Sequence, residues 1–240
     1  MNLVKVNDRW PLYVSDRKYA TDWKPPSTWE HERLATMFER IEPGDVVYDV
    51  GSEEGEFPAL FGTWGAEVVL IEPSPFAWPD IRRHWNTNVD RPPAGWFVGF
   101  ATDDDDPHLV SYNDNPMRGW PQCAYNKPDP GHGFRHLNDE INYGRSSRHG
   151  RLDTLPEQFG WPAPDVVTVD VEGGEGHVLR GAVNLLRVHR PVVFVSVHPT
   201  YLQDLFGENA DEHVHQLMAD CGYEGTHIAT DHEEHWMYLP

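Results

Sequence analysis

Short apolar runs alternate with segments of helical periodicity along most of the chain. Apolar runs of strand length occupy 46–50, 68–71, 96–100, 166–169 and 192–197, and apolar residues recur at helical spacing in 34–41, 57–63, 79–88, 176–189 and 211–221. Buried strands that alternate with helices are typical of a parallel sheet covered on both faces. Two short segments at 223–229 and 234–240 predict a hairpin. The pattern therefore predicts an α/β fold whose mostly parallel sheet ends in a C-terminal antiparallel hairpin.

Two segments stand outside this alternation. Residues 1–26 have few periodic signals and end in Lys24-Pro25-Pro26, so we expect an irregular N-terminal arm. Residues 102–150 contain five prolines and five glycines without sustained periodicity, which is typical of a binding loop, a lid or disorder. Ser27 and Glu30 have the spacing of a capping box at the start of a helix. We expect one domain over 27–240, with a long loop or lid insertion at 102–150.

Composition narrows the classes of partner. The chain has 240 residues and a formal net charge of −20, which disfavours nucleic acid because phosphate binding requires a basic face. No window approaches the roughly 18 apolar residues of a membrane span, and no apolar signal-peptide core follows Met1, so we expect no membrane insertion. The two cysteines lie outside any Cys-x-x-Cys pattern, which favours the cytoplasm. The oligomeric state is not indicated.

The first apolar run ends in a glycine turn with unusual charge. Asp49, Gly51 and Gly55 form the pattern Asp-x-Gly-x-x-x-Gly, which lacks the middle glycine of a dinucleotide fingerprint. Three glutamates occur within 53–56. A phosphate charge about 4 Å from one of them would be repelled by roughly 4 kcal/mol at an effective dielectric of about 20. The turn therefore favours a ligand that carries positive charge and no phosphate.

S-adenosylmethionine (SAM) has that charge pattern, with an ammonium, a sulfonium and a nucleoside. Glu72 closes the second apolar run 21 residues after Gly51, where a carboxylate can accept both ribose hydroxyls. NAD sites share this carboxylate, so Glu72 by itself indicates only a nucleoside. The alternative interpretation is a tight turn with a solvated acidic rim.

Four segments in order resemble a known family. GDVVYDVGSEEGEF and VVLIEPSP are similar to the cofactor motifs of class I SAM-dependent methyltransferases. RLDTLPEQF, followed by DVVTVDVEGGEGHVLRGAVNLL and RPVVFVSVHP, resembles the FkbM family within that class. The resemblance implies a Rossmann-like, doubly wound, seven-stranded sheet with SAM as the methyl donor. It also implies O-methylation of a hydroxyl on a sugar, a glycan or a small metabolite.

The resemblance also implies roles for particular residues. The implied cofactor-binding residues are Asp49, Gly51, Ser52, Glu53 and Gly55 for the methionine end, Glu72 for the ribose, Ala101 and Thr102 for the adenine, and Asp170 beside the methyl group. The chain departs from the family in two places. Ser52-Glu53 stands where the family usually has Ala-Asn, and Ser196 stands where a glutamate is common.

Methyl transfer to an aliphatic hydroxyl requires a general base or a Lewis-acidic metal near the acceptor. His198 ends an apolar run and titrates near neutral pH, so we expect it to be the base, with Asp170 beside it. Asp170, Glu172 and Glu175 offer the hard oxygen ligands that Mg²⁺ prefers. His198 as a strand cap, and the glutamates as a turn into a helix, are the structural alternatives. The C-terminal histidines His227, His232 and His235 are expected on the surface.

The sequence is also compatible with two other functions. A non-catalytic nucleoside-binding module would retain the methyltransferase fold, and the changes at Ser52, Glu53 and Ser196 would suit it. An NAD-dependent oxidoreductase would also place a ribose on Glu72, but the missing middle glycine disfavours it.

Overall fold

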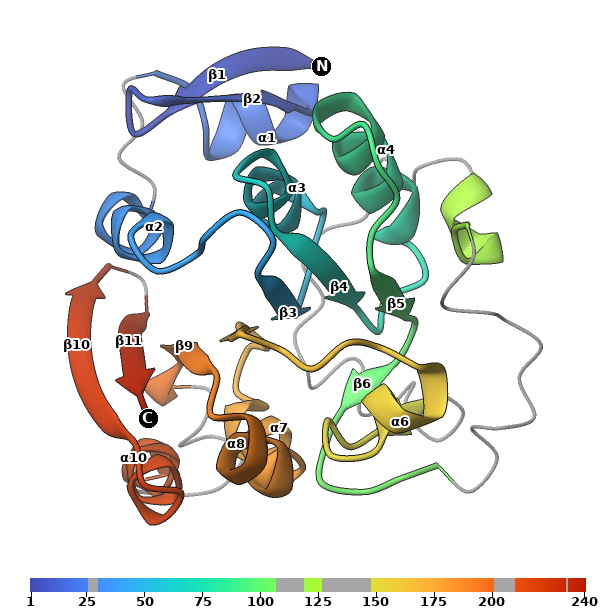
Figure 1. Ribbon diagram of the computed structural model, residues 1–240. Coiled ribbons are helices and arrows are strands. Elements are labelled where there is room, and N and C mark those ends of the chain that lie inside the picture. Colours follow the sequence, from blue (N-terminus) through green and yellow to red (C-terminus); the bar gives the residue numbers. More distant parts are fainter. Residues whose placement is uncertain (26–29, 107–118, 127–147, 201–209, 232) are drawn as a thin grey trace.

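The chain folds around one seven-stranded sheet (Figure 1). The computed structural model describes residues 1–25, 30–106, 119–126, 148–200, 210–231 and 233–240. In sheet order the strands are β10 (Glu224–Thr230), β11 (Glu234–Leu239), β9 (Val192–Val197), β8 (Val166–Val169), β3 (Val46–Val50), β4 (Glu67–Ile71) and β5 (Gly95–Phe97). β11 runs antiparallel to both β9 and β10, and the remaining pairs are parallel. The predicted fold class is confirmed.

Helices cover both faces of this sheet (Figure 1). One face carries α3 (Glu56–Thr63) and α4 (Trp78–Asn88), and the other carries α7 (Glu175–Arg180), α8 (Val183–His189) and α10 (Ala210–Asp220). Successive strand residues belong to different cores: Val47 packs with the first set of helices and Tyr48 with the second. A strand with both faces covered is mostly apolar, and all five residues of β3 are buried, with Asp49 as its one charged residue.

The predicted elements differ from the structure at two glycines. The expected helix over 176–189 is divided into α7 and α8 at Gly181, where a Cβ would lie 1.9 Å from the Thr102 carbonyl oxygen, so this close approach requires glycine. The expected strand over 96–100 stops at Phe97, and a separate strand β6 (Phe100–Ala101) pairs with β7 (His149–Gly150). Gly99 lies at this break, where a Cβ would meet the Phe97 ring at 2.5 Å.

The expected irregular N-terminal arm is wrong. The segment forms an antiparallel hairpin of β1 (Asn2–Val6) and β2 (Trp10–Val14), followed by α1 (Asp16–Thr21). Alternate residues of both strands are buried in the core beside α3 and α4, which is the period of two that a half-buried strand requires. Ser15 caps α1 by accepting a hydrogen bond from the Lys18 backbone N–H.

Other predictions fall partly outside the described residues. Ser27 of the expected capping box is outside them, and Glu30 precedes α2 (His31–Phe38) without a side-chain cap bond. Within the expected insertion, the structure describes 102–106, 119–126 with a short 3₁₀ helix η2 (Gln122–Tyr125), and 148–150, so its interpretation as a lid stays a prediction. The helix α6 (Leu155–Phe159) follows it. Within the described ranges, no helix is both long and apolar enough to span a membrane.

Candidate functional site

The glycine turn lies at the carboxyl edge of the sheet and touches the end of β8. Gly51 has φ +91°, and its N–H donates to the Ile71 carbonyl at 2.9 Å. A Cβ on Gly51 would lie 1.7 Å from the Asp170 carbonyl oxygen, so only glycine allows this approach. The structure therefore brings together the first turn and Asp170, which the sequence separates by more than a hundred residues.

Asp49 is buried beneath this turn, and only one of its two carboxylate oxygens accepts a hydrogen bond from the described residues. The Thr168 hydroxyl donates to Oδ1 at 2.8 Å, while Oδ2 has no hydrogen-bond partner among the described residues. Burial raises the pKa of Asp49 to about 6, against the opposing effects of the Ser52 and Thr168 hydroxyl groups. A carboxylate oxygen held in this way can accept a hydrogen bond from a cationic ligand group.

Glu72 joins the loops that follow β3 and β4. Its carboxylate accepts backbone hydrogen bonds from Glu53 at 3.1 Å and from Ser74 at 2.8 Å. These bonds fix the carboxylate at the sheet edge, in the position that the sequence predicts for a ribose acceptor. A carboxylate has about four lone-pair sites and can accept hydroxyl donors as well as backbone N–H groups.

The acidic residues of the turn hold the N-terminal segment. Lys18 of α1 lies 2.9 Å from Glu53 and 3.9 Å from Glu56, and Arg17 pairs with Glu54. Burial opposes the charge of Lys18, but the neighbouring glutamates outweigh it and raise the pKa of Lys18 above its usual value. Two cations thus offset the acidic loop, so the phosphate repulsion expected from these glutamates is smaller than their number suggests.

Replacing Lys18 with methionine tests this docking. The substitution leaves Glu53 and Glu56 without their cation, and we expect the free energy of unfolding to fall by about 1 to 3 kcal/mol. This range lies below that of a fully buried pair because Glu53 is 46% exposed. Lys5→Met is the matched control on an exposed strand position of β1. Urea denaturation would contradict the docking if both variants unfolded at the same midpoint as the wild type.

The predicted adenine residues lie beside β7. Ala101 belongs to β6 and pairs with Gly150, and the Thr102 N–H donates to the Gly150 carbonyl at 3.1 Å. β5, which precedes them, lies next to Glu72, whose N–H donates to the Phe97 carbonyl. Their contact with a nucleoside stays a prediction.

His198 is surrounded by carboxylates at the end of β9. Its Nδ1 lies 2.7 Å from Glu175 Oε1, while Nε2 lies 3.0 Å from Glu233 Oε2, 3.6 Å from Glu172 Oε1 and 3.8 Å from Asp170 Oδ1. Of the three predicted metal ligands, Asp170 and Glu172 therefore face one ring nitrogen, and Glu175 faces the other. Glu233, in the turn between β10 and β11, was missed in the sequence because a hairpin turn gives no signal of what it reaches.

This environment changes the chemistry expected of His198. Burial disfavours the charged ring, but hydrogen bonds to Glu175 and Glu233 and the charge of Asp170 outweigh it and raise the pKa of His198 to about 12. A general base requires the neutral imidazole, and with this raised pKa most of His198 is the protonated imidazolium at neutral pH. The role of His198 as a base stays a prediction. In this arrangement His198 must first lose a strongly held proton before it can accept one from the acceptor hydroxyl.

Arg33 is a second residue that the sequence did not single out. It lies buried on α2, donates to Asp170 Oδ2 at 2.8 Å, and pairs with Glu30. Burial raises the pKa of Glu30 to about 8, although the charge of Arg33 opposes this shift. Arg33 was not identified because the apolar pattern of this helix marked Leu34, Met37, Phe38 and Ile41 as the buried face.

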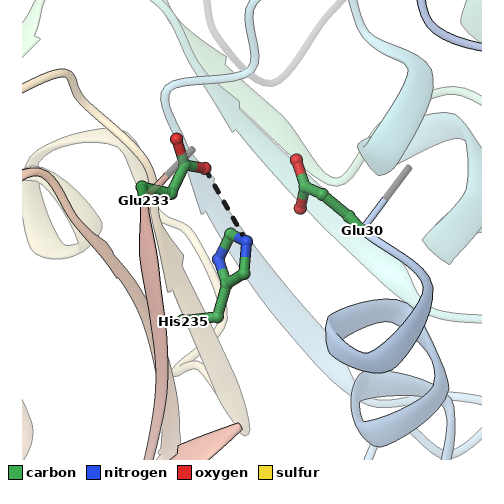
Figure 2. A group of neighbouring side chains, drawn as sticks. All are labelled: Glu30, Glu233 and His235. Carbon is green, nitrogen blue, oxygen red and sulfur yellow. Dashed lines mark ion pairs between the residues drawn. The ribbon is translucent and has the colours of Figure 1, made fainter. Parts of the chain in front are cut away.

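Glu30, Glu233 and His235 converge from α2 and the C-terminal hairpin (Figure 2). The surface position expected for His235 is wrong: its side chain is buried, with Nδ1 3.1 Å from Ser196 Oγ and Nε2 3.2 Å from Asp231 Oδ1. Ser196, which replaces the usual glutamate of the family, thus contacts His235. His227 is exposed as expected, and His232 lies outside the described residues.

The sheet order, the paired helical layers and the glycine turn at the carboxyl edge define the class I methyltransferase fold. Residues 45–224 match the Methyltransferase FkbM domain, and the chain belongs to this family. It is 28% identical over 172 residues to the hexuronic acid methyltransferase AglP of Haloferax volcanii, a match that covers 70% of this chain. The chain spans 62% of the length of that relative.

A solved methyltransferase shares the fold at low identity. A precorrin-6y C5,15-methyltransferase from Geobacter metallireducens GS-15 has a TM-score of 0.50 at 12% identity, covering 95% of this chain and 98% of that chain. Methyltransferase FkbM from Methylobacillus flagellatus KT has a TM-score of 0.48 at 16% identity, covering 82% of this chain and 44% of that chain.

Proposed function

We propose that the protein is a SAM-dependent methyltransferase that methylates a hydroxyl of a sugar, a glycan or a related small metabolite. The observation that carries the proposal is the placement of Asp49, Gly51 and Glu72 at one sheet edge, next to the His198 cluster. Membership in the FkbM family supports methyl transfer, and the name of the Haloferax relative supports a sugar acid as acceptor.

The residues present fit SAM. Asp49 Oδ2 is buried and lacks a partner among the described residues, which suits the ammonium of the methionine end. Gly51 approaches the end of β8 without a side chain, and Glu72 presents an oriented carboxylate for the ribose hydroxyls. When bound, SAM supplies an electrophilic methyl group on a sulfonium.

The chain must then orient the acceptor and take its proton. An aliphatic hydroxyl becomes a useful nucleophile only as its proton leaves. Asp170 and Glu172 lie where β8 ends, beside the turn that holds the cofactor, and offer carboxylate oxygens for that proton. Arg33 holds Asp170 through its Oδ2 and leaves Oδ1 toward His198.

Methyl transfer from labelled SAM tests the proposal. Glucose, glucuronic acid and a simple phenol serve as acceptors, because they separate a sugar hydroxyl, a sugar carboxylate and a non-sugar hydroxyl. We expect label in the sugar as an alkali-stable ether. Label that alkali releases as methanol would indicate a carboxyl ester and contradict O-methylation of a hydroxyl. Asp103→Asn is a control, since Asp103 pairs with His177 and Arg180 at the surface of α7.

Binding of the product S-adenosylhomocysteine should depend on pH through Asp49. The ionised carboxylate is the form that holds the ammonium, and its pKa is raised to about 6. Affinity is therefore expected to be full above that pH and to fall up to about tenfold per unit below it. Arg33 and Asp170 also act on Asp49, with opposite signs. Calorimetry from pH 5 to 8 should show that Asp49→Asn binds S-adenosylhomocysteine weakly and with an affinity that does not change with pH. If the affinity of this variant fell with pH as steeply as that of the wild type, a group other than Asp49 would cause the pH dependence.

A further inference from the structure

We infer that Asp170, His198 and Glu233 form a binding site for one divalent transition-metal ion, next to the proposed acceptor position. The inference deepens the proposed function and rests on it, because the ion would act on the acceptor hydroxyl. The sequence predicts Asp170, Glu172 and Glu175 as ligands; the proposed site keeps Asp170, adds His198 and Glu233, leaves out Glu172, and gives Glu175 a supporting position.

The three ligand atoms have the spacing of a coordination shell. One atom from each residue lies within 4.8 Å of the other two. His198 Nε2 lies 3.0 Å from Glu233 Oε2 and 3.8 Å from Asp170 Oδ1. Ligands about 2.0–2.2 Å from one ion are separated from each other by roughly 3 to 3.5 Å, so small rotations of Asp170 complete the shell.

Glu175 supports His198 in the way that is usual for a metal-bound histidine. Its Oε1 lies 2.7 Å from His198 Nδ1, which directs Nε2 toward Asp170 and Glu233. The same oxygen accepts the Gly173 N–H at 3.0 Å, so the carboxylate is itself fixed. A carboxylate behind the imidazole raises its basicity as a ligand.

The charges of the cluster leave room for a cation. Five carboxylates, on Glu30, Asp170, Glu172, Glu175 and Glu233, converge on the two cations Arg33 and His198. Glu175 is fully buried, and its Oε2 has no hydrogen-bond partner within the described part of the chain. Burial raises the pKa of Glu30 and of Glu172 to about 8, so the site disfavours this density of negative charge, and buried carboxylates are normally paired or coordinate a metal. A divalent ion that displaces the His198 proton would add one positive charge to the cluster.

The neighbouring group of Glu30, Glu233 and His235 does not form an equal second site (Figure 2). Arg33 donates to Glu30 and supplies the positive charge on that side. Glu233 Oε1 lies 4.0 Å from His235 Nε2, while Oε2 faces His198 at 3.0 Å. The geometry thus gives one ion on the His198 side, with His235 bordering the far side of the Glu233 carboxylate.

The ligand types select the class of ion. A mixed shell of imidazole and carboxylate suits first-row ions such as Mn²⁺ or Zn²⁺, whereas Mg²⁺ prefers oxygen ligands alone. The Mg²⁺ expected from the carboxylates alone is therefore the less suitable ion. Bound at this place, the ion would lower the pKa of a coordinated hydroxyl.

Titration of Mn²⁺ into the full chain, stripped with EDTA and dialysed, tests the site. Calorimetry and the electron paramagnetic resonance signal of free Mn²⁺ should both give one bound ion per chain. Glu233→Gln and His198→Gln should each weaken binding at least tenfold. The double variant Asp103→Asn, His177→Gln is the matched control, because it removes an acid and a histidine from a partly exposed pair between the segment after β6 and α7, and it should leave Mn²⁺ binding unchanged.

S-adenosylhomocysteine binding in the same samples separates the two proposals and shows that each variant is folded. A wild type that binds S-adenosylhomocysteine but no Mn²⁺ at millimolar concentration would overturn the metal site and leave the proposed function intact. Equal loss of Mn²⁺ in the control variant would also overturn it, since binding would then be spread over surface acids. Mn²⁺ bound without S-adenosylhomocysteine would support the site and contradict the proposed function.

Discussion

Glu72→Gln is expected to weaken S-adenosylhomocysteine binding by about ten- to a hundredfold, as measured by calorimetry. The substitution removes a charged acceptor, whose hydrogen bonds contribute roughly 1.5–3 kcal/mol. It also turns an amide NH₂ toward one of two donors, since the Glu72 carboxylate accepts the N–H groups of Glu53 and Ser74. The loss should appear in affinity without a change in stoichiometry.

Glu67→Gln is the control for this substitution. Glu67 begins the same strand, β4, at its opposite end and is exposed, so the change in charge is equal and the site is untouched. We expect wild-type affinity. Equal weakening in both variants would mean that net charge, rather than a contact at Glu72, determines binding, and unchanged affinity in Glu72→Gln would exclude Glu72 as the ribose acceptor.

Gly51→Ala is expected to have the largest effect on stability. Gly51 has φ +91°, which costs a residue with a Cβ about 1–2 kcal/mol. The new methyl would also lie 1.7 Å from the Asp170 carbonyl oxygen, so β3 and β8 must separate. Overpacking of this kind typically adds about 1–3 kcal/mol. We expect the free energy of unfolding to fall by about 3 kcal/mol or more, with loss of cofactor binding.

Gly44→Ala is the control that introduces backbone strain without a steric clash. Gly44 has φ +98°, but a Cβ there meets nothing within 4 Å. Its cost should be limited to the backbone term of about 1–2 kcal/mol. Denaturation curves that give the two alanine variants the same midpoint would contradict the close contact between the glycine turn and β8.

The parallel sheet was predictable because burial on both faces leaves a direct signal. The bounds of β3, β8 and β9 agree with the mostly apolar runs at 46–50, 166–169 and 192–197, since strands covered on both faces are built largely from apolar residues. Asp49, Glu72 and Asp170 were identifiable for the same reason. Each is the acid at or next to the end of an apolar run, and parallel strands bring these ends to one edge.

The partners of these residues were not predictable, because they come from elements whose pattern shows no link to the site. Lys18 and Arg33 are buried cations on two short helices, and their partners at the site, Glu53 and Asp170, lie far away in the sequence. Glu233 reaches His198 from a hairpin turn. The first hairpin, β1 and β2, was missed because five-residue strands with alternating burial give a weak signal beside the long apolar runs.

Parallel calorimetric titrations of the wild-type chain with S-adenosylhomocysteine and with NAD test the central claim most directly. The account predicts one S-adenosylhomocysteine per chain at about micromolar affinity, near −8 kcal/mol, and no saturable binding of NAD. Binding of NAD would show that the glycine turn accepts a pyrophosphate despite the missing glycine. Binding of neither ligand would contradict a cofactor site at Asp49, Gly51 and Glu72.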